Sequence, residues 1–191
     1  LEYDDVMNKQ REIIYGQRRM VLEGREVKDT IMEYLYNTVD ASISSFCNRE
    51  IPKSEWDFDN LFHTLDQIFP LSLYATVDDL KSRPVDEMSE FLKAIVDRTY
   101  ADKEQQIGPD VMREIERSIM LQVIDRKWME HLDNMDFLRE GIGLRGYAQQ
   151  DPVIAYQKEA FEMFGQMIDT VQEEVARIIY RVQIAQEPAR R

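Results

Sequence analysis

The stretch that decides the fold is FLREGIGLRGYAQQDP, residues 137–152, which holds three of the seven glycines in the chain. Glycine loses more backbone freedom in a helix than alanine does, so a cluster of glycines predicts a turn. Asp151 and Pro152 then favour a new helix, because aspartate caps free backbone amides and proline suits the first helical position. The stretch is therefore predicted to be the tip of a helical hairpin. Its turn or hinge residues are Gly141, Gly143 and Gly146.

The predicted tip also carries larger side chains than a short polar connector usually has. These are Ile142, Leu144, Arg145 and Tyr147. Apolar and aromatic residues at the apex of a loop either fold back onto their own helices or contact another molecule. The residues alone leave both alternatives open. The second alternative makes these four side chains a candidate contact site.

Apolar residues recur at helical spacing on both sides of the tip. The Gly-Pro-Asp sequence at 108–110 is predicted to start one helix, which ends at Leu138, and a return helix follows from Pro152 to about Val182. Because the two patterns have similar lengths, they predict an antiparallel pair that buries its apolar stripes. The stripes consist of Val111, Ile115, Ile119, Val123 or Ile124, Trp128, Leu132, Met135 and Leu138 before the tip, and of Tyr156, Ala160, Phe164, Met167, Val171, Val175, Ile178 and Val182 after it.

The first part of the chain is predicted to be one very long helix, from about Asp4 to Phe46. Such a helix would be roughly 60 Å long, which is typical of a strut against which other domains pack. Gly16 and Gly24 weaken it, each by roughly 1 kcal/mol relative to alanine. Gly24 allows a bend, but no proline enforces a break. The apolar stripe consists of Val6, Ile13, Met20, Val27, Ile31, Leu35, Val39, Ile43 and Phe46.

Residues 51–107 change character, because prolines divide them into short segments. Proline removes an amide donor and blocks continuation of a helix, so three short helices are predicted here. They cover about 59–69, one or two turns after Thr76, and about 85–103. Thr76 with Asp79 resembles a capping box. The segment is more acidic than basic, which predicts either an acidic docking surface or an ordinary solvated face.

Composition excludes several classes of protein. With 191 residues, 43% hydrophobic and 32% charged, the chain resembles an ordinary soluble protein. Its formal net charge of -13 argues against nucleic-acid binding, and acidic residues alternate with the arginines at 18, 19 and 25 that an RNA contact would use. No apolar run is long enough to predict a membrane-spanning helix. The single cysteine, Cys47, excludes an internal disulfide and predicts a small buried residue in a reducing cytoplasm.

No sequence pattern for catalysis or for metal binding is found. The glycines of the tip do not follow the GxxxxGK[ST] spacing of a phosphate-binding loop. His63 and His131 are far apart and have no cysteine or HExxH-type companion, so no metal site is predicted. His131 is predicted to be a hydrogen-bonded, partly buried residue rather than a catalytic base. The residues alone therefore predict an all-α binding or scaffolding protein, for which a free-standing adaptor or dimerisation module is an alternative.

Three motifs resemble the C-terminal half of SecA, the ATPase motor of bacterial preprotein translocation. They are LEYDDVMNKQREIIYGQR at 1–18, DRKWMEHLDNMDFLREGIGLRGYAQQDP at 125–152 and YQKEAFEMF at 156–164. They occur in the order of the family and at about its spacing. The resemblance covers nearly the whole chain, although 51–107 matches by length and helix content rather than by motif.

The resemblance implies a helical scaffold domain with its long helix over 1–48, a helical wing domain over 49–107, and the two-helix finger and C-terminal helix of the scaffold over 108–191. The implied fold class is all-α, with a long scaffold helix, an antiparallel two-helix finger and a small inserted wing domain. The nucleotide-binding and preprotein-crosslinking domains of the family would precede the chain, and its zinc-binding tail would follow. The resemblance thus implies a non-catalytic fragment without a cofactor or metal, whose parent protein uses ATP and magnesium.

The resemblance also implies a role for the tip. Tyr147 matches the fingertip aromatic residue that meets the translocating polypeptide at the mouth of the SecY channel. Ile142, Leu144 and Arg145 match the surrounding loop, which in the family also helps to restrain ATPase activity. Gly143 departs from the family pattern, because many relatives have histidine there. The implied partners are the other domains of the parent, the SecY channel, unfolded preproteins and a homodimer, without nucleic acid, in the bacterial cytoplasm and peripherally at the inner membrane.

Overall fold

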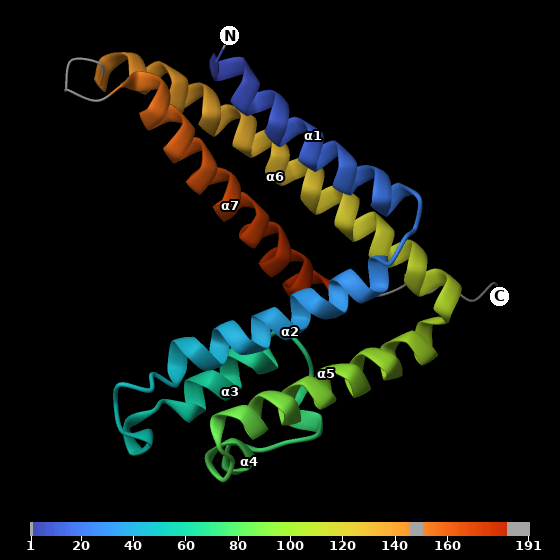
Figure 1. The fold of residues 1–191 in the computed structure, drawn as a ribbon. Coiled ribbons are helices and arrows are strands. Elements are labelled where there is room, and N and C mark those ends of the chain that lie inside the picture. Colours follow the sequence, from blue (N-terminus) through green and yellow to red (C-terminus); the bar gives the residue numbers. More distant parts are fainter. Residues whose placement is uncertain (1, 146–150, 183–191) are drawn as a thin grey trace, which may run out of the picture. The chain divides into compact units, whose positions relative to one another are not determined.

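The computed structural model of the chain describes residues 2–145 and 151–182, and the regular elements within these ranges are all helical (Figure 1). The predicted all-α class is confirmed. The α-helices are α1 (Glu2–Leu22), α2 (Val27–Phe46), α3 (Phe58–Asp66), α4 (Val77–Lys81), α5 (Val85–Ile107), α6 (Pro109–Arg145) and α7 (Pro152–Ile179), and the short 3-10 helices are η1 (Lys53–Glu55) and η2 (Leu71–Leu73).

The helices form two compact units. The first unit consists of residues 1–27 and 117–174, and it contains α1 and most of α6 and α7. The second unit consists of residues 28–116 and the described residues from Val175 onward, and it contains most of α2 and all of α3, α4 and α5. These units divide the chain at other positions than the predicted domain boundaries after 48 and 107, which stay a prediction.

The place of α2 in the second unit follows from its contacts with α5. Asp40 of α2 accepts hydrogen bonds from the Ser89 hydroxyl (2.7 Å) and from the Lys93 ammonium (2.6 Å) of α5. These bonds lower the pKa of Asp40 despite the opposing effect of its burial. The apolar stripe predicted for α2 is confirmed. Its buried members are Val27, Ile31, Leu35, Val39 and Ile43.

The prediction of one helix over 4–46 is wrong, because the chain turns between α1 and α2. Gly24 adopts a φ of 71°, and its N–H donates to the Val21 carbonyl at 3.0 Å. The N–H of Arg25 donates to the Met20 carbonyl at 3.2 Å. This pair of bonds is the Schellman motif, in which a glycine with positive φ ends a helix and satisfies its last carbonyls. Gly24 therefore ends α1 rather than merely weakening a longer helix.

The stripe predicted for α1 is shifted by one residue. Ile13 and Met20 are 50% and 48% exposed, whereas the residues one position further along the chain, Ile14 and Val21, are buried. A break at Gly24 uncouples the buried face of α1 from that of α2. Each helix can then turn the face that suits its own partners toward the core.

The α6 helix continues through the predicted turn, so the assignment of Gly141 and Gly143 as turn residues is wrong. Between them Ile142 is only 1% exposed. Burying an isoleucine side chain contributes roughly 1.5–3 kcal/mol, which offsets the cost of about 2 kcal/mol for two helical glycines. Packing therefore extends α6 to Arg145. Gly146, the third predicted turn residue, lies outside the described residues.

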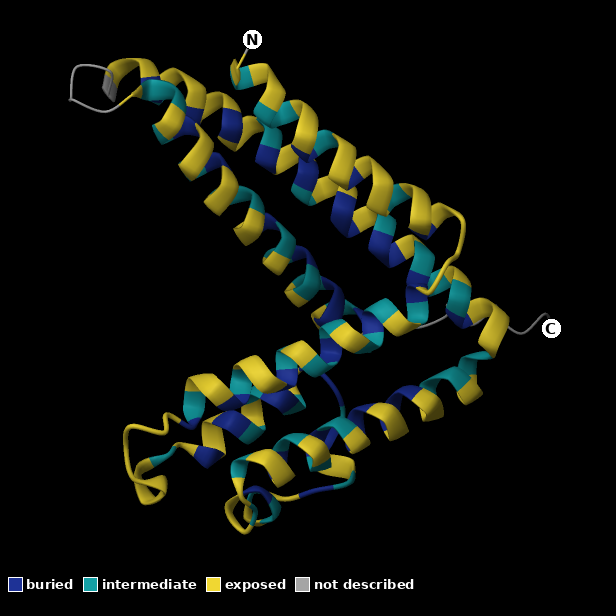
Figure 2. Cartoon of the chain, in the orientation of Figure 1, coloured by how far each residue is buried: buried dark blue, intermediate teal, exposed yellow. Residues whose placement is uncertain are grey.

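The predicted helix starts are confirmed at both long helices of the hairpin. The α6 helix begins at Pro109 after Gly108, and α7 begins at Pro152. The Asp151 carboxylate accepts a hydrogen bond from the N–H of Val153 at 2.9 Å, as expected of a capping aspartate. Figure 2 shows the buried residues of α6 and α7 as stripes that alternate with exposed residues.

The three helices predicted within 51–107 are present as α3, α4 and α5, although α5, with 23 residues, is not short. The capping box at the start of α4 is present, because the Asp79 carboxylate accepts a hydrogen bond from the N–H of Thr76 at 2.8 Å. This backbone hydrogen bond lowers the pKa of Asp79. The side chains that fill the core of these segments are Leu61, Leu65, Leu71, Leu80, Met88 and Leu92.

Candidate functional site at the end of the α6–α7 hairpin

The free end of the α6–α7 hairpin has an apolar core of its own. Met135, Leu138 and Ile142 of α6 form it together with Tyr156 and Ala160 of α7, and all five are buried. Residues three and four positions apart lie on one face of a helix, so the three side chains of α6 point toward α7 together. The two helices therefore support each other up to the last turn of α6.

The N-terminal part of α1 packs against this core as a third helix. The Tyr3 ring meets the Tyr156 ring edge-on, with centroids 4.8 Å apart and an interplanar angle of 82°. The Arg139 guanidinium lies 5.5 Å from the centroid of the Tyr3 ring and pairs with Asp4 at 3.3 Å. The aromatic contact is the stronger one, because exposed ion pairs such as the latter contribute about 0–1 kcal/mol.

A buried polar contact joins α1, α6 and α7 further along the hairpin. The side-chain amide of Gln10 donates from Nε2 to the Ala160 carbonyl at 3.1 Å, and its Oε1 lies 2.6 Å from Nε2 of His131. Since Oε1 can only accept, the assigned tautomer of His131 carries its proton on Nε2. Each polar group in this contact is satisfied, which makes burial tolerable.

His131 is held between aromatic rings as well. Its ring centroid lies 5.6 Å from that of Trp128 and 5.7 Å from that of Phe164. Burial lowers the pKa of His131, because it disfavours the charged imidazolium. The prediction of a hydrogen-bonded, buried histidine is confirmed. Its partner Gln10 was not predicted, although a glutamine four residues before Ile14 on a helical stripe is a signal that could have found it.

Ion pairs tie the hairpin together at the other end of the first unit. Glu174 of α7 pairs with Arg126 and, at 3.4 Å, with Lys127 of α6. Arg18 of α1 pairs with Asp125 of α6 at 3.0 Å. These side chains are partly exposed, so the pairs fix the register of the helices more than they stabilise them.

The structure separates the predicted tip residues. Ile142 is a core residue, so its assignment to a contact surface is corrected, because its side chain is already covered by the hairpin. Leu144 is 79% exposed at the end of α6. Arg145 is the last residue of α6, and its side chain lies outside the described part of the structure. Gly146 and Tyr147 lie outside the described residues. Ile142 therefore folds back onto its own hairpin, whereas the exposed Leu144 is available to contact another molecule.

The outer surface of the hairpin carries further apolar residues that the sequence did not single out. Phe137 of α6, and Ile154 and Phe161 of α7, are large apolar side chains exposed to solvent. Each lies outside the buried stripe of its helix. Only the tertiary pairing of the helices shows which of the many apolar residues remain uncovered.

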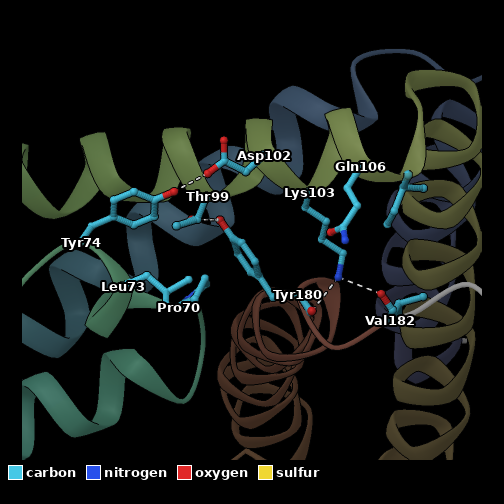
Figure 3. Close-up of a pocket in the computed structure, with 10 residues that line it drawn as sticks. Pro70, Leu73, Tyr74, Thr99, Asp102, Lys103, Gln106, Tyr180 and Val182 are labelled. Carbon is cyan, nitrogen blue, oxygen red and sulfur yellow. Dashed lines mark hydrogen bonds between the residues drawn. The ribbon is translucent and has the colours of Figure 1, made fainter.

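A hollow of about 700 Å³ in the second unit is a second candidate site (Figure 3). The Tyr74 hydroxyl donates to the Asp102 carboxylate at 2.5 Å on one side of it. Near the middle, the hydroxyls of Thr99 and Tyr180 share a hydrogen bond of 3.1 Å. Burial raises the pKa of Tyr180, so its hydroxyl stays protonated.

The lysine in this hollow already has partners. Lys103 donates to the carbonyls of Tyr180 (2.6 Å) and Val182 (2.8 Å), which follow the end of α7. A cation at the C-terminal end of a helix is stabilised by the helix dipole and satisfies the last carbonyls. The polar groups of the hollow thus hold α5 and the end of α7 together, which is a structural role.

Two kinds of feature were sought among the described residues, a metal site and a membrane-spanning helix. Within 2–145 and 151–182, no group of histidine, cysteine, aspartate or glutamate side chains is placed to hold a metal ion. None of the helices in these ranges has both the length and the apolar character needed to cross a membrane. Fold and site together define an all-helical class of protein, in which α6 and α7 pack as a hairpin.

Comparison with known proteins identifies the family. The model of the family described as "SecA Wing and Scaffold domain" matches residues 1–183. The chain belongs to this family.

Similar proteins carry one functional name. "Protein translocase subunit SecA" of Pelotomaculum thermopropionicum is 44% identical over all 191 residues of the chain, which cover 22% of that protein. The protein of the same name from Clostridium novyi is 42% identical over 96% of the chain and 22% of its own length. "Protein translocase subunit SecA 1" of Streptomyces avermitilis is 41% identical over 98% of the chain and 20% of its own length. The chain spans about a fifth of the length of these relatives.

Proposed function

We propose that the chain is the non-catalytic scaffold and polypeptide-contacting part of a bacterial SecA motor. In this role it couples ATP-driven motion of other domains to the passage of preproteins through the SecY channel. Membership of the wing and scaffold family supports the role, as do relatives named as protein translocase subunits. The parent protein would bind ATP and magnesium in domains outside this chain, and would work in the bacterial cytoplasm, peripherally at the inner membrane.

The observation that carries the proposal is the contrast between two neighbours at the end of α6. Ile142 is 1% exposed within the hairpin core, while Leu144 is 79% exposed two residues later. A paired-helix rod that stays packed to its last turn transmits displacement from its base to its end. An exposed apolar side chain at that end contacts any polypeptide, because apolar contact is non-directional. Tyr147 would add an aromatic ring with one polar group.

Two substitutions in the full-length parent protein test this role. Leu144→Ser and Tyr147→Ala should each lower ATP-dependent transport of a preprotein into SecY-containing vesicles by about tenfold, the loss expected for a residue that anchors a contact. Met129→Ser is the matched control, since Met129 is also an exposed apolar residue of α6 but lies more than three turns before its end. Transport at the normal rate by a motor that lacks 135–151 would contradict the finger role.

A free-standing adaptor or dimerisation module is a second candidate function. The exposed phenylalanines Phe137 and Phe161 favour it, because uncovered aromatic side chains on a helical hairpin are typical of protein contacts. Sedimentation of the isolated chain separates the two candidates. A concentration-dependent dimer that Phe137→Glu or Phe161→Glu dissociates would favour the module, whereas a monomer at all concentrations favours the motor segment.

A further inference from the structure

The hollow between α5 and the end of α7 has the size and the lining of a small-molecule site. All of its lining residues belong to the second unit. Its volume of about 700 Å³ lies within the range of about 300–1,000 Å³ that is usual for ligand pockets. Apolar and aromatic side chains form part of its wall, and a few polar groups form the rest. Those polar groups indicate which ligand the hollow suits.

Lys103 brings a positive charge to the hollow that no carboxylate of the described residues pairs with. Its ammonium group has three protons and donates two of them, to the carbonyls of Tyr180 and Val182. Both acceptors are neutral. Burial lowers the pKa of Lys103, as expected of a cation that is partly removed from water without an anion beside it. The structural role of Lys103 therefore leaves one proton available to an anionic ligand.

Gln106 supplies a second donor next to this ammonium group. It follows Lys103 by three residues in α5, so the two side chains lie on the same face of the helix. Figure 3 shows the Gln106 amide beside the Lys103 side chain, and this amide has no hydrogen-bond partner among the described residues. Two neighbouring donors suit the two oxygens of a carboxylate. A phosphate group carries more charge and more oxygens than these two donors can satisfy.

The apolar part of the wall lies beside these donors. Leu73 is 74% exposed, although it lines the hollow. In Figure 3 the Tyr180 ring lies between Leu73 and Lys103, and Ile107 and Val182 complete the lining near the lysine. A ligand that spans this distance would cover Leu73 and the face of the ring. Removing that apolar surface from water favours a ligand with an apolar body.

The carboxylate that already lines the hollow does not neutralise Lys103. Asp102 accepts a hydrogen bond from the Tyr74 hydroxyl at 2.5 Å, on the other side of the hollow in Figure 3. The Arg98 guanidinium lies 4.5 Å from the centroid of the Tyr74 ring, so a positive charge accompanies this carboxylate. Repulsion between Asp102 and a ligand at Lys103 is thereby reduced.

We propose that the hollow binds a small organic acid in which one carboxylate is attached to an apolar body. The carboxylate accepts hydrogen bonds from Lys103 and Gln106, and the apolar body covers Leu73 and the Tyr180 ring. The proposal does not depend on the role in protein transport proposed above, since every residue of this site lies outside the hairpin end.

Titration of the whole 191-residue chain, followed by NMR, tests the site with 4-phenylbutyrate as the probe. We expect a dissociation constant of about 1 mM, which is ordinary for a ligand of this size, with the largest shifts in the backbone amides of the lining residues. The neutral isostere 4-phenylbutanamide should bind at least about tenfold more weakly, because it loses the charge-assisted hydrogen bond to Lys103. Binding of the acid should also raise the pKa of the Lys103 ammonium group.

Two variants locate the binding site without disturbing the hydrogen bonds of Lys103. Leu73→Glu removes apolar surface and places a negative charge at the edge of the hollow, so it should weaken binding of 4-phenylbutyrate by at least about tenfold. Ile51→Glu is the matched control, because Ile51 is also an exposed apolar residue of the second unit but does not line the hollow. It should leave the affinity unchanged.

Three results would overturn the proposal. The first is the absence of saturable shifts in the lining residues up to 10 mM 4-phenylbutyrate, and the second is equal affinity for the acid and its amide. The third is an equal effect of Leu73→Glu and Ile51→Glu. Inorganic phosphate is the remaining arm of the test. If it displaces 4-phenylbutyrate at equal concentration, the site binds anions in general and the proposed ligand class is wrong.

Discussion

The first unit buries a neutral polar contact, whereas the second unit buries an ionic one. In the first unit, the amide of Gln10 joins the uncharged imidazole of His131 to a backbone carbonyl. In the second unit, the Glu116 carboxyl group is 0% exposed and pairs with Nε of Arg113 at 2.6 Å. The Tyr100 hydroxyl donates a hydrogen bond to the same carboxyl group, and Arg113 also pairs with Glu104.

This difference gives the two units opposite responses to pH. Burial lowers the pKa of His131 and raises that of Glu116, because in both residues it disfavours the charged form. Burying a neutral imidazole therefore becomes costly in acid, whereas burying a carboxyl group becomes easier. One physical cause thus acts with opposite sign in the two units.

Removing the positive partner of the buried carboxylate should have the largest effect on stability. Arg113→Ala leaves the carboxyl group of Glu116 buried without its cation. We expect the free energy of unfolding of the second unit to fall by about 3 kcal/mol. This value is the lower end of the range for a broken buried ion pair, because the Arg113 side chain is 37% exposed. Urea denaturation followed by amide hydrogen exchange measures the loss unit by unit. Arg126→Ala, which breaks an exposed pair of the first unit, should cost less than about 1 kcal/mol. Equal losses of stability in Arg113→Ala and Arg126→Ala would contradict this contrast between the units.

Truncating the core at the hairpin end should be the next largest effect, in the first unit. Ile142→Ala removes three carbons from a buried site, so we expect a loss of about 2 kcal/mol, with the last turns of α6 exchanging amide protons faster. Leu144→Ala is the control, because an exposed substitution usually changes stability by less than about 0.5 kcal/mol. A similar loss in both variants would contradict the assignment of Ile142 to the core.

Acidification should change the stabilities of the two units in opposite directions, by a smaller amount. The folded-state pKa of His131 lies below its ordinary value of 6.5, so the stability this residue contributes is present above pH 6.5 and is lost as the pH falls through the lowered pKa. For Glu116 the folded-state pKa lies above 4.5, so its contribution is present below pH 4.5 and is lost as the pH rises through the raised pKa.

Amide protection factors between pH 7 and pH 5 measure this separation. The first unit should lose protection relative to the second, and the change within either unit is limited to about 1.4 kcal/mol per pH unit, the value for one proton. His131→Leu should abolish the acid-dependent loss in the first unit. A loss that persists in this variant would show that another group is responsible.

The smallest effect should come from the cap of α4 in the second unit. Asp79→Ala removes the carboxylate that accepts from the N–H of Thr76, so we expect a small decrease in the unfolding temperature. Thermal unfolding of Asp79→Ala and Asp79→Asn compares the two cases, since asparagine retains an acceptor oxygen. If the cap stabilises α4, the unfolding temperature of the asparagine variant should lie closer to that of the original chain than the unfolding temperature of the alanine variant does.

Sequence reasoning succeeded where local chemistry decides. Pro109 and Pro152 were correctly predicted to start helices, and Thr76 with Asp79 was correctly predicted to form a capping box. These features depend on hydrogen bonds and φ angles within a few residues, which the local sequence contains. The Schellman motif at Gly24 is just as local, but the continuous apolar stripe predicted one helix through this glycine.

Sequence reasoning failed where burial depends on a distant partner. Gln10 and His131 are separated by 121 positions, and nothing near Gln10 indicates that a helix carbonyl and an imidazole will cover it. Glu116 has the composition of an exposed helical residue, yet Tyr100 and Arg113 enclose it. Ile142 was predicted at a tip because two glycines flank it, but its burial against α7 keeps that segment helical.

The amino-acid order alone settled that the chain is all-α, where most of its helices start, and that two long amphipathic segments return on each other around 137–152. It could do so because helix periodicity, caps and breakers act over one or two turns. Only the tertiary structure decided which face of α1 is buried, how far α6 extends past its glycines, and which polar side chains are enclosed. Those outcomes depend on the free energy of burial against residues far away in the chain, which no local pattern records.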